Sequence, residues 1–356
     1  RKPEFGTTQQ GIYIKQSDSD LIALRASNAV RSRAFKMSSD DTQFIELKGA
    51  IINMERALIY ISESDRIIVG DSTQNLVFVF DMDGELLFSF GRSGRGPGEF
   101  NFITGIMQLS MGDILVSEPS GRIHRFSDNG TFLRTYNIPI TGNMVRMTEI
   151  NSRKLLLAGL NKRGAGNLLH FFDLDTGDIT QSFFEAPFEM GAFGGVLYSQ
   201  SSTASAIFDG TYIYAFISFK DALYVFDLNA NLINVVDNIN FEHILPLTPE
   251  PERLSERELA EKMESFSRIT NLYWVDEDVM LIEHYKSVDV QLSPFRFSVE
   301  YGFAIMKTNG TVIAEESNVP RTYGFNGDEG LIYRGAFENP TNGTQLIEEL
   351  PYSIRE

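Results

Sequence analysis

The chain has 356 residues, no cysteine, 28 phenylalanines and a formal net charge of −17. This acidity argues against a nucleic-acid binder, because an acidic protein repels the phosphate backbone. The lack of cysteine excludes a disulfide framework, thiolate catalysis and cysteine-ligated zinc or iron–sulfur clusters. No stretch approaches the roughly 18 uninterrupted apolar residues of a membrane helix, so we expect no transmembrane segment.

Residues 1–41 show no clear periodicity, and we expect an N-terminal extension that is either a tether or a packed segment. The folded domain is expected over residues 42–356. The sequence begins with Arg1 and contains no apolar leader, which indicates a processed or truncated chain.

From residue 51 onward, aromatic and β-branched residues gather in short runs separated by Gly, Asn, Asp or Ser, a pattern typical of strands. The clearest repeated unit is an apolar run, a tight turn rich in Asp-Gly or Asn-Gly, and a second apolar run, which predicts a hairpin. The first three turn glycines, Gly84, Gly130 and Gly177, lie 46 and 47 residues apart. Such a period is the signature of a propeller blade of four antiparallel strands. The five copies span residues 77–88, 123–133, 169–179, 223–233 and 303–313.

We therefore predict an all-β chain, a six-bladed β-propeller of four-stranded antiparallel blades. The sixth blade offers only three strands, and Thr42–Lys48 is expected to supply its fourth. This pairing of the two chain ends would close the ring and remove a free sheet edge. The six blades are expected at residues 51–91, 103–137, 144–184, 203–236, 269–316 and 321–350.

One stretch carries a family resemblance. Phe90–Phe100, with the sequence FGRSGRGPGEF, resembles the glycine-rich connection between blades of NHL-repeat propellers. The repeat pattern of residues 42–350 is similar to that of the six-bladed NHL- or TolB-like propellers common in Bacteroidetes and related bacteria. Such proteins are usually exported, often as lipoproteins, so the resemblance implies a periplasmic, cell-surface or extracellular location. The lipid-bearing cysteine of a lipoprotein is absent from this sequence.

The interval between blades four and five is too long for a simple connection, and residues 240–268 are expected to be an insertion. Within it, Ser255 and Glu258 form a capping box, and apolar residues then recur at helical spacing. A short amphipathic helix is predicted over residues 255–266. Its apolar face either packs on the propeller rim or serves as a lid or partner-docking element. A long strand pair around residues 287–299 is expected as a second insertion.

Five residues are candidates for binding. Arg92 and Arg95 are cations on the glycine-rich connection, where they could contact an anion or a carboxylate. Arg95 or Glu99 could equally lock adjacent blades together. His284 and Tyr285 belong to the densest polar cluster in an otherwise apolar strand of blade five. A strand end that faces solvent explains this cluster as well as a binding site does.

No catalytic or metal-ligating residues are assigned. His124 and His170 occupy equivalent third-strand positions and are expected to be half-buried sheet residues. Propellers of the amidating-lyase type hold zinc with several inner-strand histidines, and nothing here matches that arrangement. Lactonase-type propellers hold calcium with carboxylates that face the channel; acidic residues are plentiful here, so calcium stays an open alternative.

Asn-Gly-Thr triplets begin at Asn129, Asn309 and Asn342, and each satisfies the N-glycosylation rule. Each also falls where a hairpin turn is expected. The turn explains these triplets in a bacterial protein, and they would be the acceptors if the source glycosylates its exported proteins.

The leading hypothesis is a non-catalytic, exported binding or scaffold propeller that recognises a protein, peptide or glycan. A variant of this hypothesis is self-assembly through residues 1–41 or the insertion, in which case other copies of the chain are partners. The alternative is a calcium-dependent hydrolase or lyase that uses the central channel. We favour a protein that is not an enzyme, since no catalytic residues are recognised. Fold-level analogy is a weak basis for assigning function, so the enzyme stays as the alternative.

Overall fold

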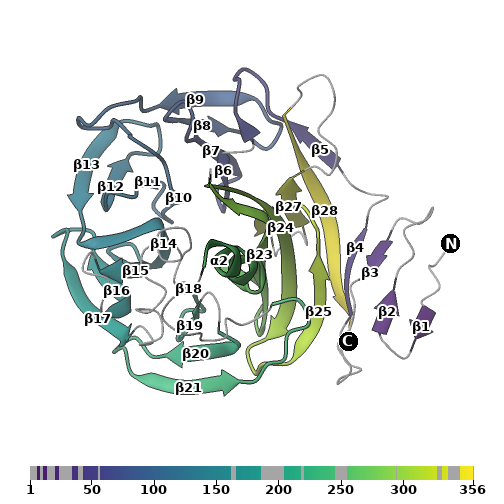
Figure 1. Cartoon of the computed structure of the whole chain (residues 1–356). Coiled ribbons are helices and arrows are strands. Elements are labelled where there is room, and N and C mark those ends of the chain that lie inside the picture. Colours follow the sequence, from purple (N-terminus) through teal and green to yellow (C-terminus); the bar gives the residue numbers. More distant parts are fainter. Residues whose placement is uncertain are drawn as a thin grey trace.

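The computed structural model describes residues 6–8, 11–13, 21–23, 34–38, 43–54, 57–161, 166–185, 204–217, 220–244, 255–293, 295–326, 331–335 and 345–355. Antiparallel sheets stand in a ring around a central channel (Figure 1), which confirms the predicted six-bladed β-propeller. Five sheets are four-stranded meanders in which neighbours in sequence are neighbours in the sheet. The strands of blades one to three are β6 (Ala57–Ser62), β7 (Arg66–Asp71), β8 (Leu76–Phe80) and β9 (Leu86–Phe90); β10 (Gly105–Gln108), β11 (Ile114–Ser117), β12 (Arg122–Phe126) and β13 (Phe132–Asn137); and β14 (Ile140–Asn151), β15 (Lys154–Asn161), β16 (Asn167–Asp173) and β17 (Ile179–Glu185).

Blades four and five follow the same path, and every blade lies within a few residues of its predicted range. Blade five is larger than the others because its two middle strands continue beyond the sheet as a long hairpin. Their strands are β18 (Ala204–Phe208), β19 (Ile213–Ile217), β20 (Ala222–Phe226) and β21 (Leu232–Asp237); and β22 (Ser267–Asp276), β23 (Val279–Leu292), β24 (Phe295–Lys307) and β25 (Val312–Ser317).

The sixth blade closes the ring as predicted. It contains β26 (Thr322–Asn326), β27 (Leu331–Gly335) and β28 (Leu346–Arg355), and β5 (Gln43–Glu46) pairs with the first half of β28. The extension continues this sheet, since β4 (Ala34–Ser38) pairs with the second half of β28 and β3 (Leu21–Ala23) pairs with β4. A separate hairpin joins β1 (Gly6–Thr8) to β2 (Gly11–Tyr13). Of the described parts of residues 1–41, β3 and β4 therefore extend blade six (Figure 1).

Each predicted hairpin joins the third and fourth strands of its blade, and its turn needs a left-handed backbone. Gly84 shows why glycine is used: its φ is +78°, and a Cβ there would lie 2.1 Å from the carbonyl oxygen of Glu46. The strand pairing also shifts register next to the turn in all five hairpins. The equivalent turn residues of the other blades are Gly130, Gly177, Ala230 and Gly310, with φ of +80°, +85°, +67° and +88°.

The core lies between neighbouring blades, where flat aromatic rings fill the space between two sheets. Between blades one and two, the ring centroids of Phe90 and Phe126 are 4.4 Å apart, and Phe100 lies 5.7 Å from Phe126. The phenylalanine-rich composition therefore belongs to the inter-blade contacts.

The inserted helix is α2 (Glu256–Glu264), and Ser255 forms the predicted capping box with Glu258. Its buried face, with Met263 at its centre, packs against Val290 and Leu292 on the long hairpin of blade five. The carboxylate of Glu264 also accepts a hydrogen bond from the backbone N–H of Val290, at 2.7 Å. The helix and the hairpin thus support each other. Within the described residues, no helix has the length and apolar character needed to cross a membrane.

Candidate functional site

The inner strands β6, β10, β14, β18, β22 and β26 surround a cavity of about 630 Å³ along the ring axis. Because every blade begins with its inner strand and repeats the same path, the first residues of these strands meet at one mouth of the channel. We call this end the arginine mouth; its lining includes Thr104, Arg146, Ser205, Thr270 and Arg321.

The blade-five insertion stands at the arginine mouth. Helix α2 ends at Glu264, and β22, whose Thr270 lines the channel, begins at Ser267. Viewed along the channel, α2 lies at the centre of the ring (Figure 1). The long β23–β24 hairpin extends past the start of β22 at the same end, since Ser267 pairs with Lys286 and the hairpin continues to Leu292.

A ladder of arginines and aromatic rings leads outward from the mouth along blade five. The guanidinium of Arg321 lies 5.9 Å from the ring centroid of Tyr301, and the Tyr301 ring lies 6.1 Å from that of Tyr285. Next in line, the guanidinium of Arg268 lies 5.4 Å from the Tyr285 ring and 4.3 Å from that of Phe266. Such cation–π contacts hold guanidinium groups without neutralising them.

Arg268 is 2% exposed, and its Nη1 donates to the Ser287 hydroxyl at 3.0 Å. Burial lowers the pKa of this guanidinium. Within the described part of the chain, neither Arg268 nor Arg321 forms an ion pair with a carboxylate. Other arginines with little exposure do have such partners: the pairs are Arg122–Glu118 at 2.7 Å, Arg125–Asp113 at 2.6 Å and Arg334–Glu348 at 2.7 Å.

Glu283 is the nearby carboxylate, and its oxygens are taken up by neutral donors. It accepts from Thr270 Oγ1 at 2.9 Å, Asn271 Nδ2 at 2.6 Å and the backbone N–H of Thr322 at 2.9 Å. These bonds tie β22 and β23 to the start of β26. The carboxylate therefore fixes the geometry of the mouth, and its negative charge also favours the charged forms of Arg146 and Arg321.

The two arginines that line the cavity affect each other. Burial, followed by the positive charge of Arg321, lowers the pKa of Arg146 to about 10. Tyr273 lines the cavity beside them, and its hydroxyl donates to the carbonyl of Thr322 at 3.2 Å. Burial, followed by the negative charge of Glu283, raises the pKa of Tyr273, so this phenol stays protonated.

The opposite mouth is acidic and polar. Glu149 accepts from the backbone N–H and the hydroxyl of Ser110, at 2.7 and 2.8 Å. Burial, followed by the negative charges of Glu63 and Glu149, raises the pKa of Tyr60 to about 12. In the part of the chain that the structure describes, no group of three or more His, Asp or Glu side chains is arranged to hold a metal ion.

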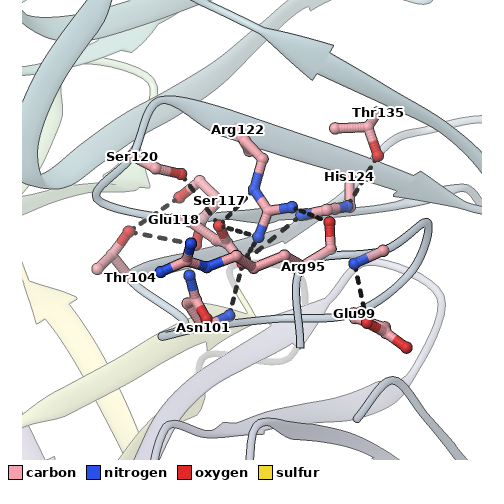
Figure 2. Close-up of polar contacts among 11 residues, drawn as sticks. Arg95, Glu99, Asn101, Thr104, Ser117, Glu118, Ser120, Arg122, His124 and Thr135 are labelled. Atoms are coloured by element: carbon pink, nitrogen blue, oxygen red, sulfur yellow. Dashed lines mark hydrogen bonds and ion pairs between the residues drawn. The ribbon is translucent and has the colours of Figure 1, made fainter. Parts of the chain in front are cut away.

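Three of the predicted binding residues lie on the connection between blades one and two. Arg92 is exposed and pairs with Glu99, whose Oε1 lies 2.7 Å from the Arg92 Nη2. Glu99 also accepts from the backbone N–H of Gly96 at 2.8 Å, and the hydrogen bonds of Gly96 and Arg92 lower its pKa. The carbonyl of Arg95 accepts from Arg122 Nη1 at 2.9 Å, which fastens the connection to blade two (Figure 2). None of these three residues is part of the channel lining.

Arg122 belongs to a buried network that holds this connection in place (Figure 2). Its guanidinium pairs with the fully buried Glu118, which also accepts from the backbone N–H of Asn101 at 2.8 Å. His124 Nε2 lies 3.7 Å from the same carboxylate, and His124 Nδ1 lies 3.0 Å from the Thr135 hydroxyl. Burial opposes ionisation of Glu118, but the donors of His124, Asn101 and Arg122 outweigh it and lower the pKa to about 2.

His284 and Tyr285 point to opposite faces of the blade-five sheet. Tyr285 belongs to the ladder of the arginine mouth, as described above. His284 is 3% exposed, so the interpretation of its polar cluster as a strand end that faces solvent is wrong. Its ring lies against Gly302, where a Cβ would come within 2.6 Å of the imidazole, and neither ring nitrogen has a hydrogen-bond partner among the described residues. Burial lowers the pKa of His284 to about 3.

The remaining candidate residues that the structure describes lie in the sheets or in hairpin turns. His124 and His170 are fully buried rather than half-buried, because each packs between two sheets and its ring lies against a hydroxyl of the fourth strand. Asn129 and Asn309 are exposed in hairpin turns, where each side chain accepts the backbone N–H two residues on. Asn342 lies outside the described residues.

Sequence reasoning named Tyr285 but missed Arg146, Arg268, Tyr273 and Arg321. The pattern that could have identified Arg321 is its position directly before an inner strand; Arg146 lies in the middle of β14, whose first residues extend beyond the level of the other inner strands. Once the blades are aligned on their hairpin turns, the first residues of every inner strand are expected at one mouth.

Comparisons with known proteins support the same architecture. A family model described as a six-bladed β-propeller (DUF5128) matches residues 35–288. The chain resembles the solved structure of a DUF4221-family member from Bacteroides vulgatus, with a TM-score of 0.63 and 12% identity over 90% of this chain and 99% of that one. A protein assigned as exported, from Bacteroides fragilis, gives a TM-score of 0.59 and 12% identity over 89% of this chain and 95% of that one.

A sequence relative is the brain tumor protein of Drosophila melanogaster, which is 24% identical over 139 residues, or 36% of this chain. The match spans only 12% of that protein's length. At these identities, the solved structures establish the fold alone.

Proposed function

The chain belongs to the DUF5128 family of six-bladed β-propellers, and on that premise we propose that it is an exported, non-catalytic binding protein whose ligand enters the arginine mouth. The observation that carries this proposal is the convergence of Arg146, Tyr273 and Arg321, from three different blades, on one cavity of about 630 Å³. A concave site with a few convergent polar groups is the usual form of a ligand pocket.

The insertion supports the choice of mouth. Helix α2 and the long hairpin of blade five stand at the arginine mouth and add contact surface there. Elements inserted into a rigid scaffold commonly carry its binding function. The ligand of such a site is a glycan, a peptide or part of a protein.

Export is supported by the Bacteroides fragilis neighbour, which is assigned as exported, and by the acidic composition. A protein with a net charge of −17 suits a solvent-exposed location better than one bound to a polyanion. Fractionation of the source cells with an antibody against the chain tests this part; a purely cytosolic signal would contradict it.

Hydrogen exchange measured by mass spectrometry tests the binding function. The purified chain is incubated separately with polysaccharide and peptide fractions from the cell envelope of its source. We expect one fraction to slow exchange in β22–β24 and at the start of β26, with no change in the outer strands β12 and β13. If no fraction protects the arginine mouth, the proposed function is wrong. Light scattering on the same samples shows whether other copies of the chain are partners.

The alternative function is a calcium-dependent hydrolase or lyase. It would use the opposite mouth, where Glu63 and Glu149 supply carboxylate oxygens of the kind that calcium prefers. Calorimetric titration with calcium, on the wild type and on Glu149→Gln, tests it. Calcium binding that Glu149→Gln abolishes would favour the alternative.

A further inference from the structure

The arginine mouth concentrates positive charge in an otherwise acidic protein. Arg146 and Arg321 line it, Arg268 is connected to it through the ladder, and Glu283 is a carboxylate of this cluster, while the whole chain carries −17. Glu283 accepts from Thr270, Asn271 and Thr322 and keeps its negative charge, which favours the charged forms of Arg146 and Arg321. Three arginines with one carboxylate among them still leave an excess of positive charge at this end of the channel.

Retaining cations with little exposure and no carboxylate partner costs stability, because a guanidinium loses hydration when it is buried. The chain places carboxylates beside other such arginines, as in Arg122–Glu118 and Arg334–Glu348. It does not do so for Arg268 and Arg321 within the described residues. A ligand anion would supply the missing charge, and a guanidinium fork matches a carboxylate particularly well.

The rest of the lining suits a ligand rich in hydroxyl groups. The hydroxyl of Thr104 lies 3.2 Å from the Ser117 carbonyl, that of Ser205 donates to the Thr270 carbonyl at 3.0 Å, and that of Thr270 donates to Glu283. Each hydroxyl commits its proton to the protein and keeps lone pairs that can accept from a ligand. Tyr273 adds an aromatic ring to the same wall of the cavity.

We propose that the arginine mouth binds an acidic sugar. The sugar carboxylate lies between Arg321 and Arg146, the pyranose ring packs beside Tyr273, and the ligand hydroxyls donate to Thr104, Ser205 and Thr270. The cavity volume of about 630 Å³ is in the range of small-ligand sites, so it fits the end of an acidic glycan and not a folded domain. This inference rests on the proposed function and specifies its ligand.

The test has two stages. The wild-type chain is first applied to an array of neutral oligosaccharides, oligosaccharides that contain uronic or sialic acid, and acidic peptides. The acidic sugar with the strongest signal, and its neutral counterpart, are then titrated calorimetrically into the wild type, Arg321→Gln, Arg146→Gln and Arg153→Gln. Arg153 is the matched control, because it is a 70% exposed arginine in the turn between β14 and β15, away from the arginine mouth, and it pairs with Asp175.

We expect saturable binding of the acidic sugar by the wild type and by Arg153→Gln. Charge-assisted hydrogen bonds contribute enough that Arg321→Gln and Arg146→Gln should each weaken binding about 10- to 100-fold. Added salt should also weaken binding, and the neutral sugar should bind more weakly by a similar factor. Circular dichroism of each variant shows whether it is folded; if Arg146→Gln does not fold, Arg321→Gln and the neutral sugar still decide the result.

Three outcomes would overturn the proposal: no acidic sugar binds, the neutral sugar binds equally well, or Arg321→Gln binds as tightly as the wild type. Binding of acidic peptides alone would also overturn it. Protection of the arginine mouth by a neutral glycan or a peptide, in the exchange experiment above, would leave the binding function standing while the acidic-sugar inference failed.

Discussion

The joint between blades one and two and the arginine mouth of blade five both contain arginines with little exposure, but they treat the charge in opposite ways. At the joint, Arg122 pairs with Glu118, which also receives the Asn101 N–H. At the mouth, Arg268 and Arg321 lie against aromatic rings, with no carboxylate bound to them in the described residues. Under the proposed function, this difference separates charges that hold the fold together from charges that await a ligand.

In both regions, the arginines or their partners lie on or next to the segment that precedes the inner strand of a blade. The connection 91–100 leads to β10, and the segment from α2 through Phe266 leads to β22. In the first case the segment is fastened by a hydrogen bond to the carboxylate of Glu118, whose two oxygens both have hydrogen-bond donors. In the second, it places Thr270 beside the cavity and Arg268 in the ladder of the arginine mouth. The same scaffold position therefore serves a structural role in one blade and forms a candidate site in another.

We expect the largest change in stability on acidification. It arises at His284, a side chain that is neither paired with an opposite charge nor kept charged, but buried in its neutral form. His284 lies on the other face of blade five, with its pKa lowered to about 3 by burial. Because the folded pKa lies below the unfolded one, the stability linked to neutral His284 is present above about pH 6.5 and is lost as the pH falls toward 3. The full loss is about 4–5 kcal/mol.

Urea unfolding of the wild type and of His284→Leu at a series of pH values measures this loss. We expect the pH dependence between about 6.5 and 4.5 to flatten in His284→Leu. Below about pH 4.5 both proteins should still lose stability, because the depressed pKa of Glu118 then comes into play. Equal slopes above pH 4.5 would mean that His284 becomes solvated in the folded protein.

Glu118→Gln should destabilise the joint between blades one and two. It keeps the size of the side chain but leaves the Arg122 guanidinium and its buried surroundings without an anion, so we expect a loss of about 3–5 kcal/mol. The part of this loss that depends on ionisation should be present above about pH 4.5 and should vanish as the pH falls toward 2. Guanidinium unfolding at neutral and acidic pH is the measurement; a loss that does not change with pH would contradict the charge pairing.

Two arginine-to-methionine changes compare the regions directly. Arg122→Met should cost about 3–5 kcal/mol, because it leaves Glu118 buried and unpaired. Arg268→Met should leave stability within about 1 kcal/mol of the wild type or raise it, because it removes a buried cation that has no carboxylate partner. Thermal unfolding of both variants checks this. Equal losses would show that Arg268 is as structural as Arg122.

Surface charge should give the smallest effect. Arg257→Gln removes an exposed i,i+4 pair with Glu261 on α2, and we expect a change below about 0.5 kcal/mol. Thermal unfolding at low and high salt measures it. A larger loss would mean that exposed charges on the insertion contribute more to stability than expected for a surface ion pair.

The fold could be predicted from the sequence because its signals are local. The turns at Gly84, Gly130 and Gly177 mark the hairpins, and their spacing sets the blade length. The capping box of Ser255 and Glu258 likewise lies within one turn of helix. Such features depend on a few neighbouring residues, whose conformational preferences are fixed by covalent geometry.

The candidate site could not be predicted in the same way. Arg146 and Arg321 are 175 residues apart in sequence and meet only when the ring closes. Arg92 and Arg95 looked accessible on a glycine-rich loop, but Arg92 pairs with Glu99 and the Arg95 carbonyl fastens the loop to blade two. Whether an arginine has a carboxylate partner is a property of the three-dimensional structure, and the sequence carried no pattern for it.

The most direct test of the central claim is the free energy of unfolding of Arg321→Gln, measured against the wild type without ligand at neutral pH. If the arginine mouth is held ready for an anion, the variant should lose no more than about 1 kcal/mol, because the favourable field of Glu283 on Arg321 is lost while the repulsion between Arg321 and the buried Arg146 is relieved. A loss of about 3 kcal/mol, as expected for a broken buried pair, would contradict the account and make Arg321 a structural residue.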